Sequence, residues 1–179
     1  MKVICISAKA RHGKDASAEI LKEIFEASGK RVLITHYADL LKYICKAFFG
    51  WNGDKDSVGR TLLQKIGTDT IGKKQPDFWV NFLVNIFRFF EHEWDIVLIP
   101  DCRFPIEAEV MKQNFDTELL RIERPGFDNG LSPEQKAHAS ETSLDNYSFD
   151  RLIYNSGTLE ELRMKLIDYA SALLEDYSV

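Results

Sequence analysis

A short polar segment between two apolar segments has the residue types needed to bind phosphate. Gly13 and Lys14 match the Gly-Lys of the phosphate-loop pattern Gly-x-x-x-x-Gly-Lys-Ser/Thr, in which backbone N–H groups and the lysine surround the phosphates of a nucleotide. Ala8 replaces the first glycine, and Asp15 replaces the Ser or Thr and offers Mg²⁺ an oxygen ligand. The residues expected to contact the nucleotide phosphates are Ala10, Arg11, His12, Gly13, Lys14, Asp15 and Ala16.

A solvated basic turn between a strand and a helix would show similar residues, so this match alone leaves that alternative open. The flanking segments favour the phosphate site. A β-branched run precedes the loop and an amphipathic segment follows it, and a phosphate loop needs both, because the N-terminus of the helix contributes partial positive charge.

The rest of the chain alternates between strand-like and helix-like segments. Buried strands are expected over residues 2–7, 31–36, 95–100, 117–123 and 151–154. Helices are expected over 14–28, 39–48, 58–71, 77–92, 105–114 and from 159 onward, with a loop over 49–57. Strands separated by helices predict one α/β domain over 1–179, with a parallel five-stranded sheet, helices on both faces, and ligands at the carboxyl ends of the strands.

Composition and charge exclude several classes of function. The 179 residues carry a net charge of −5, which argues against a nucleic-acid polymer as partner, because such binding requires broad neutralisation of phosphates. Cys5, Cys45 and Cys102 form no paired motif, so neither disulfides nor a zinc site is expected. No apolar run is long enough to cross a membrane or to act as a signal peptide, so no membrane partner and a cytoplasmic location are expected.

Several later motifs, taken in order, match one group of enzymes. They are Asp77-Phe78-Trp79, Asp101-Cys102-Arg103-Phe104-Pro105-Ile106-Glu107, His138-Ala139-Ser140-Glu141 and Asn155-Ser156-Gly157-Thr158. Together with Gly13-Lys14-Asp15 they resemble the phage-type deoxynucleoside monophosphate kinases, relatives of dephospho-CoA kinase among the P-loop kinases. The resemblance covers nearly the whole chain. It implies a three-layer P-loop kinase fold, a helical acceptor-binding subregion over about 38–92 and a lid over about 124–142.

The resemblance also implies a reaction and its catalytic residues. ATP with Mg²⁺ would donate its γ-phosphoryl group to a (deoxy)nucleoside monophosphate, a small-molecule nucleotide substrate. Asp101 and Arg103, at the end of the third expected strand, would face the transferring group, although charges at a strand end are often only solvated. The implied catalytic residues are Lys14, Asp101, Arg103 and Arg124, and Asp15 is the implied metal ligand.

The acceptor would lie against the helical subregion. Arg60 and Gln64 lie four apart on one helical face, a spacing that allows both to reach one ligand but that a plain polar surface also shows. Trp79 would stack on the base, whereas aromatic residues at this spacing more often belong to the core. The implied acceptor-binding residues are Asp39, Lys42, Arg60, Gln64, Trp79, Arg103, Glu107, His138 and Glu141.

Two further segments, besides the phosphate loop, would hold the donor ATP. Arg121 and Arg124 lead into the lid, and Asn155, Gly157 and Thr158 follow the last strand, where relatives hold the adenine ring.

For Glu107, two roles are equally expected: a carboxylate at the first turn of a helix, favoured by the helix dipole, or a group that holds Arg103 in place.

The chain departs from the family pattern at two positions. Ala8 replaces a glycine, and Ala16 replaces a threonine whose hydroxyl Ser17 is poorly placed to substitute. A P-loop kinase for another small acceptor such as dephospho-CoA, and a catalytically weak nucleotide-binding protein, therefore stay open as alternatives. A homodimer, the accepted base and the accepted sugar are also left open.

Overall fold

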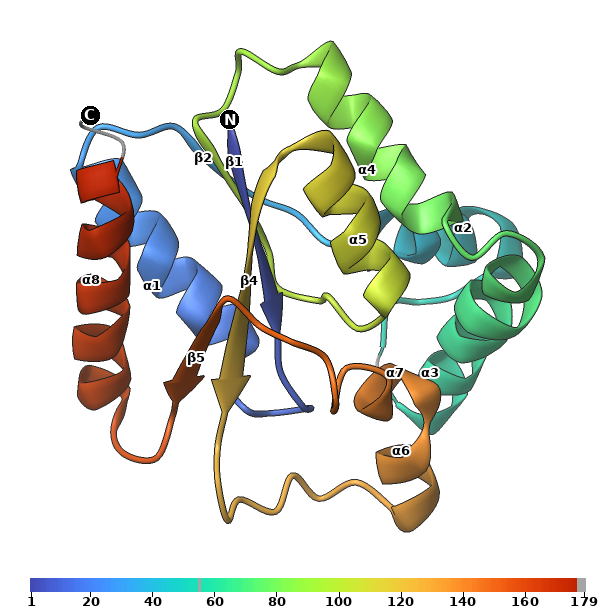
Figure 1. The fold of residues 1–179 in the computed structure, drawn as a ribbon. Helices are drawn as coiled ribbons and strands as arrows, with labels where there is room; N and C mark the ends of the chain where they lie inside the picture. The colour runs from blue at the N-terminus through green and yellow to red at the C-terminus, as the bar shows by residue number, and fades with distance from the viewer. Residues whose placement is uncertain (55, 177–179) are drawn as a thin grey trace.

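The computed structural model describes residues 1–54 and 56–176 and contains a five-stranded parallel sheet in the order β2-β3-β1-β4-β5 (Figure 1). The strands are β1 Lys2–Ser7, β2 Val32–Ile34, β3 Ile96–Ile99, β4 Asp116–Glu123 and β5 Arg151–Tyr154. The helices are α1 Lys14–Ala27, α2 Ala38–Phe49, α3 Ser57–Gln64, η1 Lys65–Gly72, α4 Phe78–Phe89, α5 Pro105–Asn114, α6 Pro133–Ala137, α7 Ala139–Thr142 and α8 Leu159–Asp176. The α/β class and the parallel five-stranded sheet predicted from the sequence are confirmed.

Two helical layers cover the two faces of the sheet. Successive residues of β1 alternate between the faces: Ile4 and Ile6 pack in the core beneath α1 and α8, whereas Val3 and Cys5 pack in the core beneath α4 and α5. This alternation follows from the two-residue period of a strand. Figure 1 shows the two pairs of helices on opposite sides of the strands, so the three-layer arrangement is present.

A third, smaller core holds the helical subregion together. Leu41, Cys45, Trp51 and Ile66 are buried in it, and they join α2, the loop after it and η1. The helix expected over 58–71 consists of α3 followed by a π-helical segment, η1. In η1, the Gly67 carbonyl accepts a hydrogen bond from the Trp79 indole at 3.2 Å, and a Cβ at Gly67 would lie 2.5 Å from a Leu41 methyl. A glycine therefore permits this close approach of α2 to η1.

The lid and the other loops gather at the carboxyl ends of the strands. The segment expected to form the lid, residues 124–142, contains two short helices, α6 and α7. Figure 1 places this segment beside α3, below the arrowheads of β1 and β4. None of the helices in the described ranges is long and apolar enough to cross a membrane.

Candidate active site

The phosphate loop, residues 8–13, joins β1 to the N-terminus of α1. Gly13 precedes the first helical residue, Lys14, and has a left-handed conformation with φ of 104°. A Cβ at Gly13 would lie 2.7 Å from the side-chain nitrogen of Asn155, which itself donates a hydrogen bond to the His12 carbonyl at 3.0 Å. The left-handed conformation therefore favours glycine at this position, and the missing Cβ leaves room for the Asn155 amide. The strand–loop–helix arrangement on which the phosphate-site prediction depended is present.

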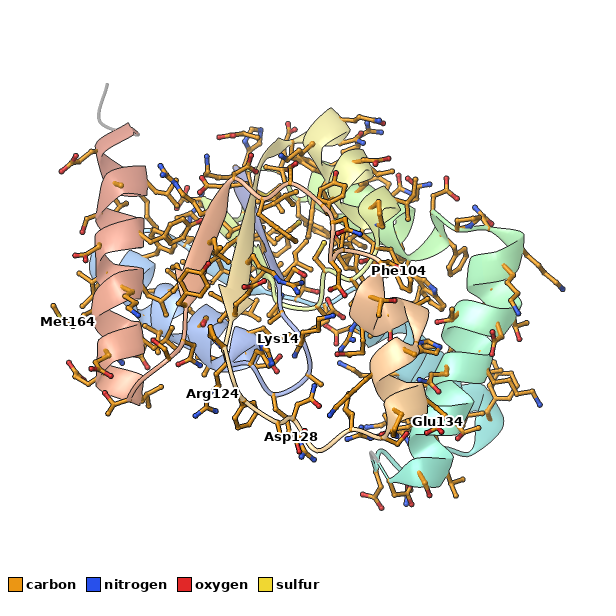
Figure 2. The ribbon with its side chains drawn as sticks, turned by 60° about the horizontal axis from the view of Figure 1, so that its bottom comes forward. Lys14, Phe104, Arg124, Asp128, Glu134 and Met164 are labelled. Carbon is orange, nitrogen blue, oxygen red and sulfur yellow. The ribbon has the colours of Figure 1, made fainter. Side chains whose placement is uncertain are left out.

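The loop faces the lid. In Figure 2, Lys14 lies near the middle of the edge formed by the strand ends, and Arg124 and Asp128 of the lid lie on the same side. Arg11, with φ of 63°, donates from Nη1 to the Asn129 carbonyl at 3.0 Å. The contact ties the phosphate loop directly to the lid.

The side chains of Asp15 and His36 meet at this edge. Asp15 pairs with the Lys14 ammonium, and one of its oxygens lies 3.8 Å from His36 Nε2. The nearby His36 ring, assisted by Lys14, lowers the pKa of the Asp15 carboxyl, and the same carboxylate raises the pKa of His36. His36 Nδ1 in turn lies 3.3 Å from Asp39. Sequence reasoning missed His36, although its place directly after β2, at the carboxyl edge, was an available signal.

Asp15 is suited to Mg²⁺ only in combination with other ligands. Its side chain is exposed at the N-terminus of α1, and Mg²⁺ commonly takes one or two carboxylates together with water and substrate phosphates. Within the described residues, no group of three or more His, Cys, Asp or Glu side chains is arranged to hold a metal ion. Ser17 lies buried inside α1, so its hydroxyl does not replace the missing threonine.

Asp101, at the end of β3, is engaged by the backbone of α2. Its two carboxylate oxygens accept hydrogen bonds from Tyr37 N–H at 2.9 Å and Ala38 N–H at 3.1 Å. A carboxylate at a helix N-terminus is stabilised by unpaired N–H groups and by the helix dipole. Asp101 therefore fixes the start of α2, and with it the helical subregion, against the end of β3. Its predicted contact with the transferring phosphoryl group stays a prediction.

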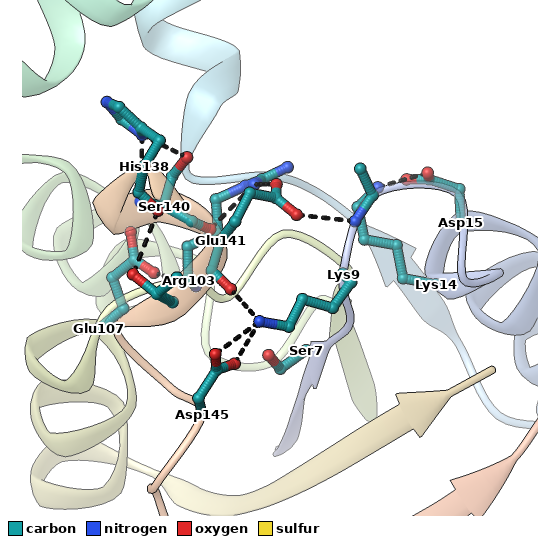
Figure 3. Close-up of polar contacts among 12 residues, drawn as sticks. Ser7, Lys9, Lys14, Asp15, Arg103, Glu107, His138, Ser140, Glu141 and Asp145 are labelled. Atoms are coloured by element: carbon teal, nitrogen blue, oxygen red, sulfur yellow. Dashed lines mark hydrogen bonds and ion pairs between the residues drawn. The ribbon is translucent and has the colours of Figure 1, made fainter. Parts of the chain in front are cut away.

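Arg103 meets the phosphate loop through Glu141 (Figure 3). Arg103 Nη1 donates to Glu141 Oε1 at 2.8 Å and to the Ser140 carbonyl at 3.1 Å. The other oxygen, Glu141 Oε2, accepts a hydrogen bond from the Ala10 N–H at 2.9 Å. Ala10 and Glu141 lie 131 positions apart in the sequence, and the fold of the lid brings them together. One carboxylate therefore joins the segment after β3 to the phosphate loop.

His138 and Lys9 place Glu141. His138 Nδ1 accepts a hydrogen bond from Ser140 N–H at 3.2 Å and caps the N-terminus of α7. Lys9 Nζ donates to the Glu141 carbonyl at 2.8 Å and to Asp145 at 2.6 Å. The His-Ala-Ser-Glu motif therefore forms a capped helical turn that presents Glu141 to the phosphate loop. The acceptor contacts predicted for His138 and Glu141 stay predictions.

Glu107 combines the two roles expected for it. Its Oε2 accepts hydrogen bonds from Arg103 N–H at 2.7 Å and from Phe104 N–H at 3.0 Å, at the first turn of α5. It thus caps the helix and also holds the Arg103 backbone. Burial raises the pKa of the Glu107 carboxyl to about 8.

The two arginines of β4 and the lid have different surroundings. Arg121 is buried within β4, the strand that leads into the lid, and its Nη1 donates to Ser7 Oγ at 2.9 Å. Its predicted contact with the donor nucleotide stays a prediction. Arg124 does lie at the start of the lid. Its N–H donates to His12 Nδ1 at 3.1 Å, and its guanidinium lies 4.1 Å from the centre of the Phe127 ring. Burial, with the nearby Arg121 charge, lowers the pKa of His12, in agreement with an unprotonated Nδ1.

The three residues after β5 that were expected to hold the donor have different contacts within the protein. Asn155 reaches the phosphate loop, as described above. Thr158 instead caps α8: its N–H donates to Glu161 Oε2 at 2.7 Å and its Oγ1 accepts from Glu161 N–H at 3.2 Å. Gly157 packs beside the same carboxylate. Their predicted contact with adenine stays a prediction.

Five of the residues predicted to bind the acceptor lie on α2, α3 and α4. Lys42 pairs with Asp39 at 2.8 Å in the first turns of α2, and Arg60 and Gln64 are both exposed on α3. The half-buried Trp79 packs between two of the cores, which agrees with the alternative that it serves the core.

A cavity of about 300 Å³ lies between the phosphate loop and the lid. Lys9, Phe127, Asn129, Lys136 and Glu141 line this cavity.

Comparisons with known proteins agree with this arrangement. A family model described as deoxynucleotide monophosphate kinase matches residues 25–166. The deoxynucleotide monophosphate kinase of Enterobacteria phage T4 is 29% identical over 109 residues, a match that spans 60% of this chain and 43% of the phage protein. The similarity therefore extends over less than half of that relative.

Solved structures share the fold at low sequence identity. The APS kinase CysC of Mycobacterium tuberculosis, in complex with AMPPNP and APS, has a TM-score of 0.55 at 12% identity, over 93% of this chain and 95% of that chain. The shikimate kinase of Aquifex aeolicus has a TM-score of 0.53 at 11% identity, over 97% and 98%. The dephospho-CoA kinase of Campylobacter jejuni has 0.51 at 12%, over 96% and 97%. The P-loop kinase fold predicted from the sequence is confirmed.

Proposed function

The chain belongs to the deoxynucleotide monophosphate kinase family, and we propose that it transfers the γ-phosphoryl group of ATP to a deoxynucleoside monophosphate. The observation that carries the proposal is the loop that joins β1 to α1 and ends at Gly13, directly before Lys14. The family match begins at residue 25, after this loop. The phosphate site is therefore independent support, since a kinase needs it and the match does not include it.

Lys14, Arg124 and Asn155 bind the donor in this proposal. Lys14 contacts the β- and γ-phosphates at the N-terminus of α1, where the helix dipole also favours anions. Arg124 and Asn155 close on the nucleotide from the lid and from the loop after β5. Mg²⁺, held by Asp15 together with the phosphates, would neutralise charge on the transferring group.

Arg103 binds the acceptor phosphate at the opposite side of the same edge. The Arg103 side chain is 31% exposed. Among the described residues, its guanidinium donates two hydrogen bonds, and both come from Nη1. Nη2 and Nε are thus left to face a phosphate, for which a guanidinium is well suited. Asp39, Lys42, Arg60, Gln64 and Trp79 would line the acceptor pocket, with Asp101 and Glu107 fixing the segments around it.

The transfer itself needs positioning and charge neutralisation rather than a covalent enzyme intermediate. An oxygen of the acceptor phosphate attacks the γ-phosphorus, the bond from that phosphorus to the β,γ-bridging oxygen breaks, and ADP leaves with the electron pair. Lys14 from the donor side and Arg103 from the acceptor side place positive charge at the two ends of this path.

Because ATP and mononucleotides are its substrates, the proposal places the protein in the cytoplasm.

A substrate panel tests the proposal. The purified protein is incubated with ATP and Mg²⁺ and, in parallel, with each common deoxynucleoside and ribonucleoside monophosphate and with dephospho-CoA, and the products are separated by ion-exchange chromatography. We expect a nucleoside diphosphate and ADP in equal amounts with at least one deoxynucleoside monophosphate. Product from dephospho-CoA alone would favour the other kinase, and ATP binding without any product would favour the weak nucleotide-binding protein.

A further inference from the structure

The carboxylate of Glu141 contacts the phosphate loop, whose N–H groups suit an anion. One oxygen accepts from the Ala10 N–H of the phosphate loop and the other accepts from Arg103 Nη1 (Figure 3). The side chain is only 8% exposed. A buried carboxylate requires paired partners, and here both oxygens have one.

The backbone around Glu141 is fastened to the same loop. Lys9, next to Ala10, donates to the Glu141 carbonyl at 2.8 Å and pairs with Asp145 at 2.6 Å. The His138 cap fixes the start of α7, the turn that carries Glu141. Hydrogen bonds from the neighbouring loop residues Lys9 and Ala10 therefore hold Glu141 in a fixed position against the phosphate loop.

A direct contact between Glu141 and the acceptor is unfavourable, because a carboxylate and a phosphate repel each other. Arg103 is the group through which Glu141 can act. The ion pair fixes Nη1 of the guanidinium, whose planar shape then sets the directions of Nη2 and Nε.

We propose that Glu141 is a positioning residue that anchors the acceptor-binding Arg103 to the ATP-binding loop. The inference rests on the proposed function, since it assigns Arg103 to the acceptor phosphate. The anchor fixes the separation between the donor phosphates, held by residues 10–16, and the acceptor phosphate, held by Arg103. Phosphoryl transfer depends on that separation, because small misplacements of reacting groups are costly in rate.

The test is a double-mutant cycle in steady-state kinetics. Glu141→Gln keeps the volume of the side chain and an oxygen for the Ala10 N–H, but it removes the ion pair with Arg103. Arg103→Gln and the double variant complete the cycle, and Glu26→Gln is the matched control, because Glu26 lies on the exposed side near the end of α1. Thermal unfolding of each variant establishes that it is folded, and calorimetry measures the affinity for ATP.

We expect Glu141→Gln to lower kcat/KM for the acceptor by about 10²-fold while the affinity for ATP changes little. In the Arg103→Gln background, the same substitution should cost almost nothing further, since it acts through the arginine. Glu26→Gln should match wild type throughout.

If the wild-type protein is an active kinase, three results would overturn the inference. Additive losses in the double variant would show that Glu141 does not act through Arg103. A lower melting temperature with unchanged kcat/KM would show a purely structural role. Tighter ATP binding by Glu141→Gln would show that the carboxylate competes with the donor for the loop. A wild-type protein that phosphorylates no mononucleotide would contradict the proposed function itself, and with it this role.

Discussion

The side-chain nitrogen of Asn155 donates a hydrogen bond to the His12 carbonyl at 3.0 Å and so fastens the loop after β5 to the phosphate loop. The contact lies directly beside Gly13, whose missing Cβ leaves the space that Asn155 occupies. The shape of the phosphate loop therefore depends on a residue near the other end of the chain as well as on its own sequence.

We predict that Gly13→Ala disrupts ATP binding. The substitution places a Cβ 2.7 Å from Asn155 Nδ2 and forces alanine to adopt a φ of 104°, which should cost about 1–3 kcal/mol. Calorimetry should show a large loss of ATP affinity. Gly29→Ala is the control, because Gly29 has a φ of 77° but a Cβ there would meet no atom of the described residues within 4 Å; it should lower stability and leave ATP affinity unchanged. Wild-type ATP affinity in Gly13→Ala would contradict the prediction.

We predict that Asp15 assists Mg²⁺ binding. Asp15→Ser restores the hydroxyl of the general phosphate-loop pattern and should keep appreciable activity, whereas Asp15→Ala should require more Mg²⁺ for half-maximal activity. A titration of initial rate against Mg²⁺ at saturating ATP measures the difference. The role is refuted if Asp15→Ala and wild type give the same Mg²⁺ dependence.

We predict that Glu107 makes stability fall as pH rises. Burial raises the pKa of this carboxyl from 4.5 to about 8, so between these values the folded protein holds a proton that the unfolded chain has released. The free energy of unfolding therefore declines across this range. Glu107→Gln has no such proton to lose, and its amide oxygen can still accept from Arg103 and Phe104.

Urea unfolding at several pH values between about 5 and 8 provides the measurement. The free energy of unfolding of wild type minus that of Glu107→Gln should decrease steadily with pH, because other titrating groups cancel in the difference. Gln113→Asn, at an exposed position on the same helix, changes no titrating group and should give a difference that does not vary with pH. A constant difference for Glu107→Gln as well would contradict the raised pKa.

Much of the fold was predictable because its signals are local. The β-branched runs of β1 and β3 and the Gly-Lys pair before α1 indicated a buried parallel sheet with a phosphate loop at its carboxyl edge. The π-helical turn of η1 was not predictable, because it depends on the approach of α2 and on the Trp79 indole.

The parts of the site that depend on distant residues were also not predictable. Asp101 accepts from the Tyr37 N–H at the start of α2, 64 positions earlier, and the bond from Ala10 to Glu141 spans 131 positions. The residue types at these positions indicated a phosphate-binding site. The pairing of their side chains, however, is decided by the tertiary structure. The contact of His36 with Asp15 likewise depends on the tertiary structure, which brings α1 beside the end of β2.

We predict that Arg60 contributes to binding of the acceptor and not of ATP. Arg60→Lys loses the planar fork that suits phosphate oxygens, so KM for the monophosphate should rise and kcat should fall, with little change in ATP affinity. Gln64→Ala, one turn along α3, should chiefly alter the preference among bases. Calorimetry with ATP and with each monophosphate separates the effects. Equal weakening of ATP and monophosphate by Arg60→Lys would show that α3 does not form the acceptor site.

The most direct measurement follows the phosphoryl group itself. The protein is incubated with ATP labelled in the γ-phosphate and with the preferred deoxynucleoside monophosphate, and the labelled products are separated by chromatography. We predict that wild type transfers the label to the nucleoside diphosphate, and that Lys14→Ala, folded by circular dichroism, does so about 10²–10³-fold more slowly. Label found only in inorganic phosphate, or transfer by Lys14→Ala at the wild-type rate, would contradict the assignment of this loop and edge of the sheet as a nucleotide kinase site.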